Sequence, residues 1–142
     1  MDLALDLARS ARDQNEVPVG AVITRNGRII AKTANCMRTM NDPTAHAEIL
    51  ALRQACEILQ TQRLTDCDLY VTLEPCAMCA AAISYARIRR LYYGVDDPKG
   101  GAVINGVRFF NDPTCHHKPE VIDGIRAKQS RDLLEAFFAS RR

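Results

Sequence analysis

The sequence predicts a three-layer α/β/α fold, in which helices cover both faces of a mixed sheet, as one domain over residues 1–142. The first observation is a strand-helix-strand pattern over residues 69–95, which predicts a parallel crossover connection. The second is an Asn26-Gly27 pair between two apolar runs, which indicates an antiparallel hairpin. The third is an amphipathic pattern near each end, which supplies helices to cover a sheet.

The first half of the chain predicts a helix, a hairpin and a second helix. Apolar residues recur at helical spacing over 3–11, and Pro18 and Gly20 break that pattern. Residues 21–24 and 28–31 predict the paired strands, Asn35 closes the second strand, and residues 36–43 read as a loop. Residues 45–59 predict a helix whose inner face carries four apolar side chains: Ile49, Leu52, Cys56 and Leu59.

The second half continues with two buried strands and ends with a helix. Residues 69–73 are almost wholly apolar, which is typical of a strand covered on both faces, and residues 91–95 form the next strand. Between them, residues 76–86 predict a helix of small side chains. We expect a mobile Gly-rich loop over 96–106, a short edge strand over 120–122 and a last helix over 125–140. The inward face of the last helix is expected to carry Leu133, Leu134, Phe137 and Phe138.

Bulk composition restricts the class of protein only loosely. The chain has 142 residues, enough for one domain with a core, and its formal charge of +2 neither requires nor excludes a nucleic-acid partner. No apolar run is long enough to span a bilayer, and the N-terminus lacks the pattern of a signal peptide, so we expect a cytoplasmic protein. In that reducing compartment the six cysteines favour metal binding over disulfides.

Two short motifs carry the chemistry: His46-Ala47-Glu48 and Pro75-Cys76-Ala77-Met78-Cys79. One imidazole and two thiolates are ligands that zinc prefers, and three protein ligands leave a position for water, which is the catalytic pattern. Glu48 can then take a proton from that water and deliver it elsewhere. Cys76 and Cys79 share one face at a helix start, whereas His46 and Glu48 converge only if they also begin a helix.

These motifs resemble the cytidine and deoxycytidylate deaminase superfamily, whose signature is H-x-E followed by P-C-x-x-C. The resemblance is closer to the bacterial tRNA-specific adenosine deaminases. It extends over nearly the whole chain, through residues 16–21, Asn35, 41–49, 69–76, 97–102 and the terminal Phe137-Phe138 and Arg141-Arg142.

The resemblance implies a five-stranded deaminase-type sheet, one Zn²⁺ per subunit, a homodimer and a substrate. That substrate is the wobble adenosine of a tRNA anticodon stem-loop, which is converted to inosine. Asn35 and the backbone N–H of Ala47 would hold the base, while Asp97, Lys99 and Arg141 would contact RNA. Without the resemblance, Asn35 reads equally as a strand-end residue, and the charged residues as solvated surface.

The sequence is also compatible with three other functions. The motif also fits a deaminase of a free nucleobase or nucleoside. An RNA-binding module with a structural zinc would need a fourth ligand, such as Cys36, Cys67 or His116. A thiol redox protein would use the Cys pair alone. A second metal site at Cys115-His116-His117 is disfavoured, because no further ligand follows in the sequence.

Overall fold

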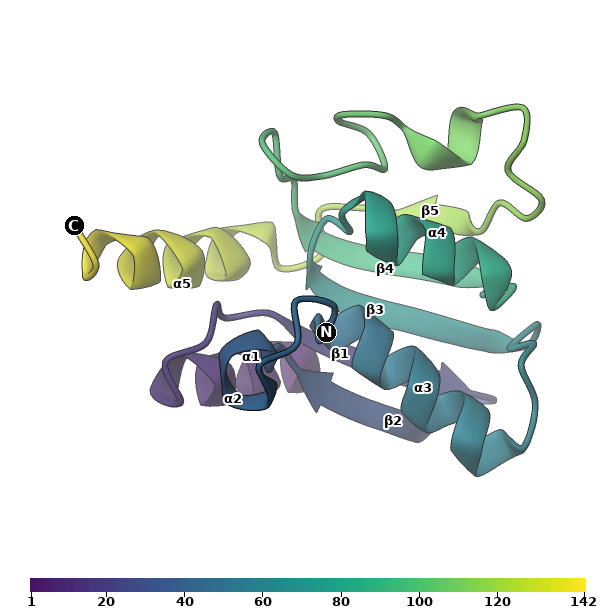
Figure 1. Cartoon of the computed structure of the whole chain (residues 1–142), viewed down its shortest axis with the longest axis horizontal. Coiled ribbons are helices and arrows are strands. Elements are labelled where there is room, and N and C mark those ends of the chain that lie inside the picture. Colours follow the sequence, from purple (N-terminus) through teal and green to yellow (C-terminus); the bar gives the residue numbers. More distant parts are fainter.

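The computed structural model describes residues 1–142 and contains one five-stranded sheet in the order β2-β1-β3-β4-β5 (Figure 1). The strands are β1 (Gly20–Arg25), β2 (Arg28–Ala34), β3 (Cys67–Leu73), β4 (Arg90–Val95) and β5 (Glu120–Ile122). Strand β1 is antiparallel to both of its neighbours, and β3, β4 and β5 run parallel to one another. Four strands therefore point the same way, and the carboxyl ends of β2, β3, β4 and β5 share one rim of the sheet.

Helices cover both faces of this sheet, which confirms the predicted three-layer α/β/α architecture. They are α1 (Asp2–Asp13), α2 (Met37–Met40), α3 (Ala47–Leu59), α4 (Ala77–Tyr85), the 3₁₀ helix η1 (Phe109–Asn111) and α5 (Ala127–Ala139). Helices α3 and α4 lie side by side on one face, and α1 and α5 contact the other face (Figure 1). None of these helices is both long and apolar enough to cross a bilayer.

The main core lies between the sheet and the α3–α4 layer. Alternate strand residues such as Leu69, Val71 and Leu91 are fully buried there against small helix residues such as Ala51 and Ala80. Alanines on the helices let them approach the sheet closely, so the apolar strand side chains fill the layer between them. The parallel step from β3 through α4 to β4 confirms the crossover predicted from sequence.

The predicted hairpin is also present. Asn26 and Gly27 both have positive φ, at 51° and 75°, which is the geometry of a type I′ turn. That turn has the twist of the strands it joins and thereby sets the register of β1 on β2.

Three details differ from the sequence-based expectations. The segment 36–43 contains the short helix α2, which ends at Asn41 in the left-handed conformation. The loop expected to be mobile, residues 96–106, is instead tied by several backbone N–H groups to the buried carboxylate of Glu74. Phe138 was expected to face inward but is 48% exposed, because the last turns of α5 extend beyond the sheet (Figure 1).

Candidate active site

The two predicted motifs meet at the carboxyl rim of the sheet. His46 occupies the N-cap position of α3, and Cys76 occupies the N-cap position of α4, just after β3 ends. Both cap residues have extended backbone, which aims their side chains across the gap between the two helix starts, and neither makes a capping hydrogen bond. Cys79 lies one turn into α4 and is fully buried.

The three ligand atoms have the spacing of a tetrahedral zinc site. Nδ1 of His46 lies 3.6 Å from Sγ of Cys76 and 3.5 Å from Sγ of Cys79, and all three atoms lie within 4.8 Å of one another. Zn–S bonds of about 2.3 Å and Zn–N bonds of about 2.0 Å at a tetrahedral angle place sulfur and nitrogen roughly 3.5 Å apart. The residues present therefore fit a zinc ion bound through Nδ1. No fourth His, Cys, Asp or Glu belongs to the group.

Hydrogen bonding within this group favours a thiolate at Cys76. The Cys79 thiol and the His46 ring both stabilise the charged form and lower the pKa of Cys76 to about 4. The same interaction, together with burial, raises the pKa of Cys79, and the hydrogen bond to Cys76 raises the pKa of His46. The protein thus holds a negative sulfur at the position where a cation would bind.

Glu48 is the second residue of α3 and is only 4% exposed. Burial, which disfavours the carboxylate, raises its pKa to about 7. A carboxyl group with a pKa near neutrality can both accept and return a proton at physiological pH. The prediction that His46 and Glu48 converge at a helix start agrees with their positions.

A cavity of about 260 Å³ opens beside these residues. Its lining includes three more predicted site residues, Asn35, Ala47 and Asp97, alongside His46, Glu48 and Cys76. The other lining residues are Val17, Val19, Met37, Leu73, Glu74 and Gly100. Asn35 is 6% exposed, and its side-chain amide makes no hydrogen bond within the chain, so a donor and an acceptor remain for a bound molecule.

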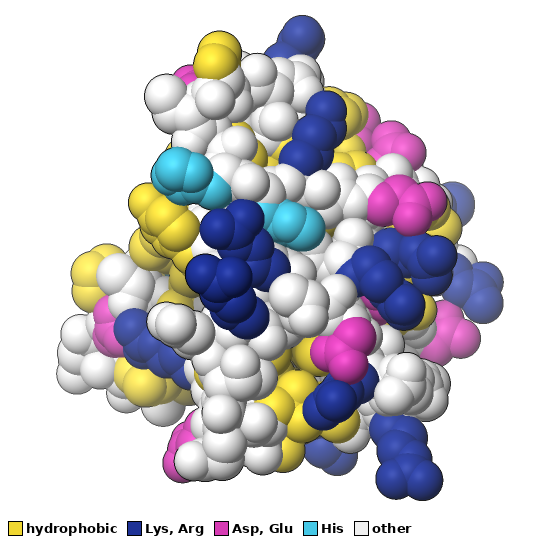
Figure 2. Space-filling view, turned by 90° about the vertical axis from the view of Figure 1, so that its right-hand side faces the viewer, with side chains coloured by type: hydrophobic (Ala, Val, Ile, Leu, Met, Phe, Trp, Pro, Cys, Tyr) yellow, Lys and Arg dark blue, Asp and Glu magenta, His cyan; other side chains and the backbone are white.

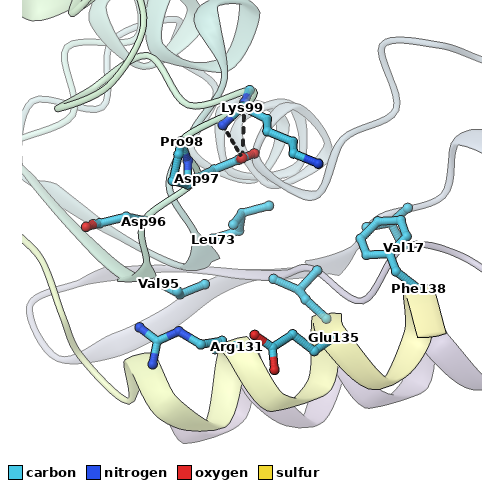
Figure 3. A pocket seen from close by; sticks show the side chains of 12 residues that line it. Val17, Leu73, Val95, Asp96, Asp97, Pro98, Lys99, Arg131, Glu135 and Phe138 are labelled. Atoms are coloured by element: carbon cyan, nitrogen blue, oxygen red, sulfur yellow. Dashed lines mark hydrogen bonds between the residues drawn. The ribbon is translucent and has the colours of Figure 1, made fainter.

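A larger groove of about 880 Å³ adjoins the cavity and shares part of its lining, including Val17 and Asp97 (Figure 3). One wall is the loop that carries Lys99, and α5 forms the other wall. The Asp97 carboxylate accepts hydrogen bonds from the backbone N–H groups of Lys99 (3.1 Å) and Gly100 (3.0 Å), shown as dashed lines in Figure 3. Asp97 therefore shapes its own loop, while the Lys99 side chain stays outside these contacts.

Arg141 is not brought to the cavity or to the groove. Its guanidinium stacks over the Phe137 ring at 3.5 Å and donates to the Phe137 carbonyl at 3.2 Å, at the end of α5. The Nε and Nη2 groups of Arg141 make no hydrogen bond within the chain, so the predicted RNA contact stays a prediction.

The remaining cysteines and histidines lie away from the ligand group. Cys67 begins β3, at the opposite end of the strand from the site. His117 contacts the Ile88 carbonyl through Nε2 at 2.6 Å, just before β4 begins. Figure 2 shows this far end of the molecule, where basic side chains gather; Arg89 and Arg90 pair there with Asp68 and Glu120.

Sequence reasoning gave no role to two buried glutamates that flank the cavity. Glu16, 1% exposed, accepts hydrogen bonds from the backbone and hydroxyl of Thr39 and so holds α2, whose Met37 lines the cavity. Glu74, 2% exposed, holds the loop on the other side. A carboxylate beside an almost wholly apolar strand is the one signal that could have indicated Glu74.

A His-Cys-Cys group with the spacing of a metal site, next to a cavity that a buried carboxyl group lines, gives this fold the features of a deaminase with a candidate metal site. The chain belongs to the MafB19-like deaminase family, whose family model matches residues 1–140.

Curated and solved relatives agree with this assignment. A tRNA-specific adenosine deaminase of Agrobacterium fabrum is 60% identical over 142 residues, which covers 100% of this chain and 93% of the relative. A solved structure from studies of A-to-I editing by tRNA:A34 deaminases at the wobble position is 61% identical, covers 94% of this chain and 97% of its own, and has a TM-score of 0.93. Guanine deaminase from Bacillus subtilis is 33% identical, with a TM-score of 0.68 over 99% of this chain and 90% of its own.

Proposed function

We propose that this protein converts adenosine to inosine at the wobble position of a tRNA anticodon loop by zinc-dependent hydrolytic deamination. One Zn²⁺ per chain would be held by His46, Cys76 and Cys79. The observation that carries the proposal is that three ligand atoms lie within 4.8 Å of one another and that two of their residues, His46 and Cys76, line one cavity with the buried Glu48. The identity of 60% to a tRNA-specific adenosine deaminase supports the choice of substrate.

The reaction replaces the amino group at C6 of adenine with oxygen. The zinc ion, when bound, supplies a water whose pKa is lowered toward neutrality. Glu48 would accept one proton of that water as the oxygen adds to C6 and pass it to the ring nitrogen. It would then take the second proton from the new C6 hydroxyl and give it to the amine, which leaves as ammonia while the C6=O bond forms. Its pKa of about 7 suits it to both directions of transfer.

Two groups that line the cavity would orient the base. The Asn35 amide offers a donor and an acceptor to a purine edge. Ala47 is the first residue of α3, so its backbone N–H has no acceptor within the helix and is free to donate to the substrate. Together they would align C6 toward the ligand group.

The nucleotides next to the wobble adenosine would lie in the groove between Lys99 and α5. A base in an anticodon loop is poorly stacked, so turning it into the cavity costs little free energy. We further propose Lys99 as a phosphate contact, and Asp97 and Arg141 as further RNA contacts. A homodimer and a cytoplasmic location are also proposed, on the resemblance to tRNA deaminases.

The test is an inosine assay on a synthetic anticodon stem-loop, read by mass spectrometry, with bound metal quantified in the same preparation. We expect conversion at the wobble position only, with about one zinc per chain. The matched control carries a guanosine at that position and should remain unchanged. Conversion of free guanine or cytidine, with none in the stem-loop, would overturn the proposed substrate.

A deaminase of a free base is the second candidate, because a guanine deaminase shares 33% identity with this chain. Free adenosine, guanine and cytidine therefore belong in the same assay. An RNA-binding module with a structural zinc is less well supported, because Cys36, Cys67 and His116 do not join the ligand group.

A further inference from the structure

The carboxylate of Glu74 is the point at which one loop is tied to the start of a ligand-bearing helix. Its Oε1 accepts three backbone N–H groups, from Val103 (3.1 Å), Ile104 (2.9 Å) and Asn105 (3.0 Å). Its Oε2 accepts the backbone N–H of Asp97 (2.8 Å) and the side-chain amide of Asn105 (2.8 Å). The loop thus closes around a buried anion with donors that converge on it, as in a backbone nest.

The loop has no room to close in this way without a glycine at position 101. A Cβ atom there would lie 2.4 Å from the Glu74 carboxyl group and 2.6 Å from the Asp97 carbonyl oxygen. Ala102 adds a second link, because its backbone N–H donates to the Pro75 carbonyl at 2.9 Å. The loop is therefore packed on the Glu74-Pro75 segment by contact as well as by hydrogen bonds.

This arrangement joins two functional parts of the molecule. Glu74 lies two residues before the ligand Cys76, and Asp97 and Gly100 line both the cavity and the groove. Any movement of the loop relative to Glu74 would shift the part of the wall that Asp97 and Gly100 form, relative to the metal ligands. Because five donors share one carboxylate, the wall is fixed before a substrate arrives.

We propose that Glu74 is a positioning residue that fixes the Asp97–Gly100 wall for binding of the RNA loop. Glu74 acts on substrate binding and not on bond breaking. All the hydrogen bonds that its carboxylate makes go to the loop, and none goes to His46, Cys76 or Cys79. This inference rests on the proposed function.

Glu74→Gln is the sharpest test, because it keeps the shape of the side chain. One oxygen can still accept the three N–H groups, but the new NH₂ faces two donors, Asp97 N–H and the Asn105 amide. We expect KM for the stem-loop to rise about tenfold with kcat within about threefold, since a tenfold change corresponds to roughly the loss of one or two hydrogen bonds. Zinc content should stay at about one per chain. Glu120→Gln, at an exposed carboxylate that pairs with Arg90 at the far end, is the matched control.

Hydrogen exchange supplies a readout that does not depend on activity. Backbone amides of residues 97–105 should exchange at least about tenfold faster in Glu74→Gln, with the amides of α4 unchanged. If the wild-type protein fails to deaminate the stem-loop, the proposed function fails, and the exchange data still decide whether Glu74 anchors the loop.

Two further variants cover the case in which Glu74→Gln does not fold. Asn105→Ala removes one donor, and Gly101→Ala forces the loop away from Glu74; both should raise KM with little change in kcat. Loss of zinc, a fall in kcat at constant KM, or unchanged exchange and kinetics in these variants would each overturn the proposal.

Discussion

Nδ1 of His46 lies 3.5 Å from Sγ of Cys79, although 33 positions separate the two residues in the sequence. The proximity arises because α3 and α4 begin at the same rim of the sheet and lie side by side. Hydrogen bonds within each helix fix the position of its first turn, so the ligand geometry is set by how the helices pack on the strands. The arrangement of the three candidate ligands is therefore a product of the fold as a whole.

Replacement of Glu48 by Gln should abolish turnover and leave the metal in place. The amide cannot accept the proton released during attack on C6, and general acid–base catalysis contributes about 10²–10⁴-fold. We expect kcat to fall by at least about 10³-fold, measured as inosine formed per chain, with unchanged zinc. Glu57→Gln, on the same helix but outside the cavity, should behave as wild type. Retained turnover in Glu48→Gln would contradict the assigned role.

Replacement of Cys79 by Ala should abolish zinc binding. Two ligands remain, and a site with two of its three protein ligands holds zinc far more weakly. Metal analysis after dialysis should show less than about one-tenth of the wild-type zinc content. Added zinc should raise the melting temperature of the wild type but not of the variant, because only a bound ligand stabilises the folded state. Cys56→Ala is the control, and equal zinc in both variants would refute the ligand assignment.

The metal-free protein should lose stability as pH rises, through Glu48. Burial raises the pKa of Glu48 from 4.5 to about 7, so the folded state binds the proton more tightly than the unfolded state. The contribution of protonated Glu48 to the free energy of unfolding is therefore fully present below about pH 4.5 and is lost as pH rises through about 7. This shift in the pKa of Glu48 corresponds to a change of about 3 kcal/mol in the free energy of unfolding.

Urea unfolding of the wild type and of Glu48→Gln, both without metal, measures the effect of the Glu48 carboxyl group together with its influence on His46 and Cys79. The free energy of unfolding of the wild type minus that of the variant should fall by about 3 kcal/mol between about pH 4.5 and about pH 8. A difference that does not vary with pH would show that Glu48 ionises normally.

Replacement of Lys99 by Ala should weaken RNA binding in a salt-dependent way. Each phosphate contact to a single strand contributes about 0.7 to the slope of log K against log salt. Anisotropy titrations of a labelled stem-loop, made in the Glu48→Gln background, should give a slope smaller by roughly that amount. Lys118→Ala changes the same charge outside the cavity and the groove, so it should leave the slope unchanged.

Much of the fold could be predicted because its signals are local. The Asn26-Gly27 turn and the apolar run of β3 each depend on residues within a few positions of one another. The candidate metal ligands could be selected from the sequence because Cys76 and Cys79 share one face of a helix and His46 lies in a short motif with Glu48; their role as ligands stays a prediction.

The parts that could not be predicted depend on contacts between distant segments. Glu74 acquires its role only when backbone N–H groups from residues 97–105 surround it, and backbone groups leave no trace in a residue pattern. Glu16 and α2 are a second example, joined through Thr39. The stacking of Arg141 on Phe137 was missed for a different reason, since a terminal arginine is equally suited to solvent, RNA or an aromatic ring.

The N-cap positions of α3 and α4 have a cost for the folding of this protein. A Ser, Thr, Asp or Asn at either position would accept a backbone N–H and stabilise its helix by about 1 kcal/mol. His46 and Cys76 make no such bond, so neither helix gains this stabilisation at its first turn. Replacing either residue with a capping side chain would stabilise its helix but remove a candidate metal ligand, so helix stability and the candidate site make opposite demands on these two positions.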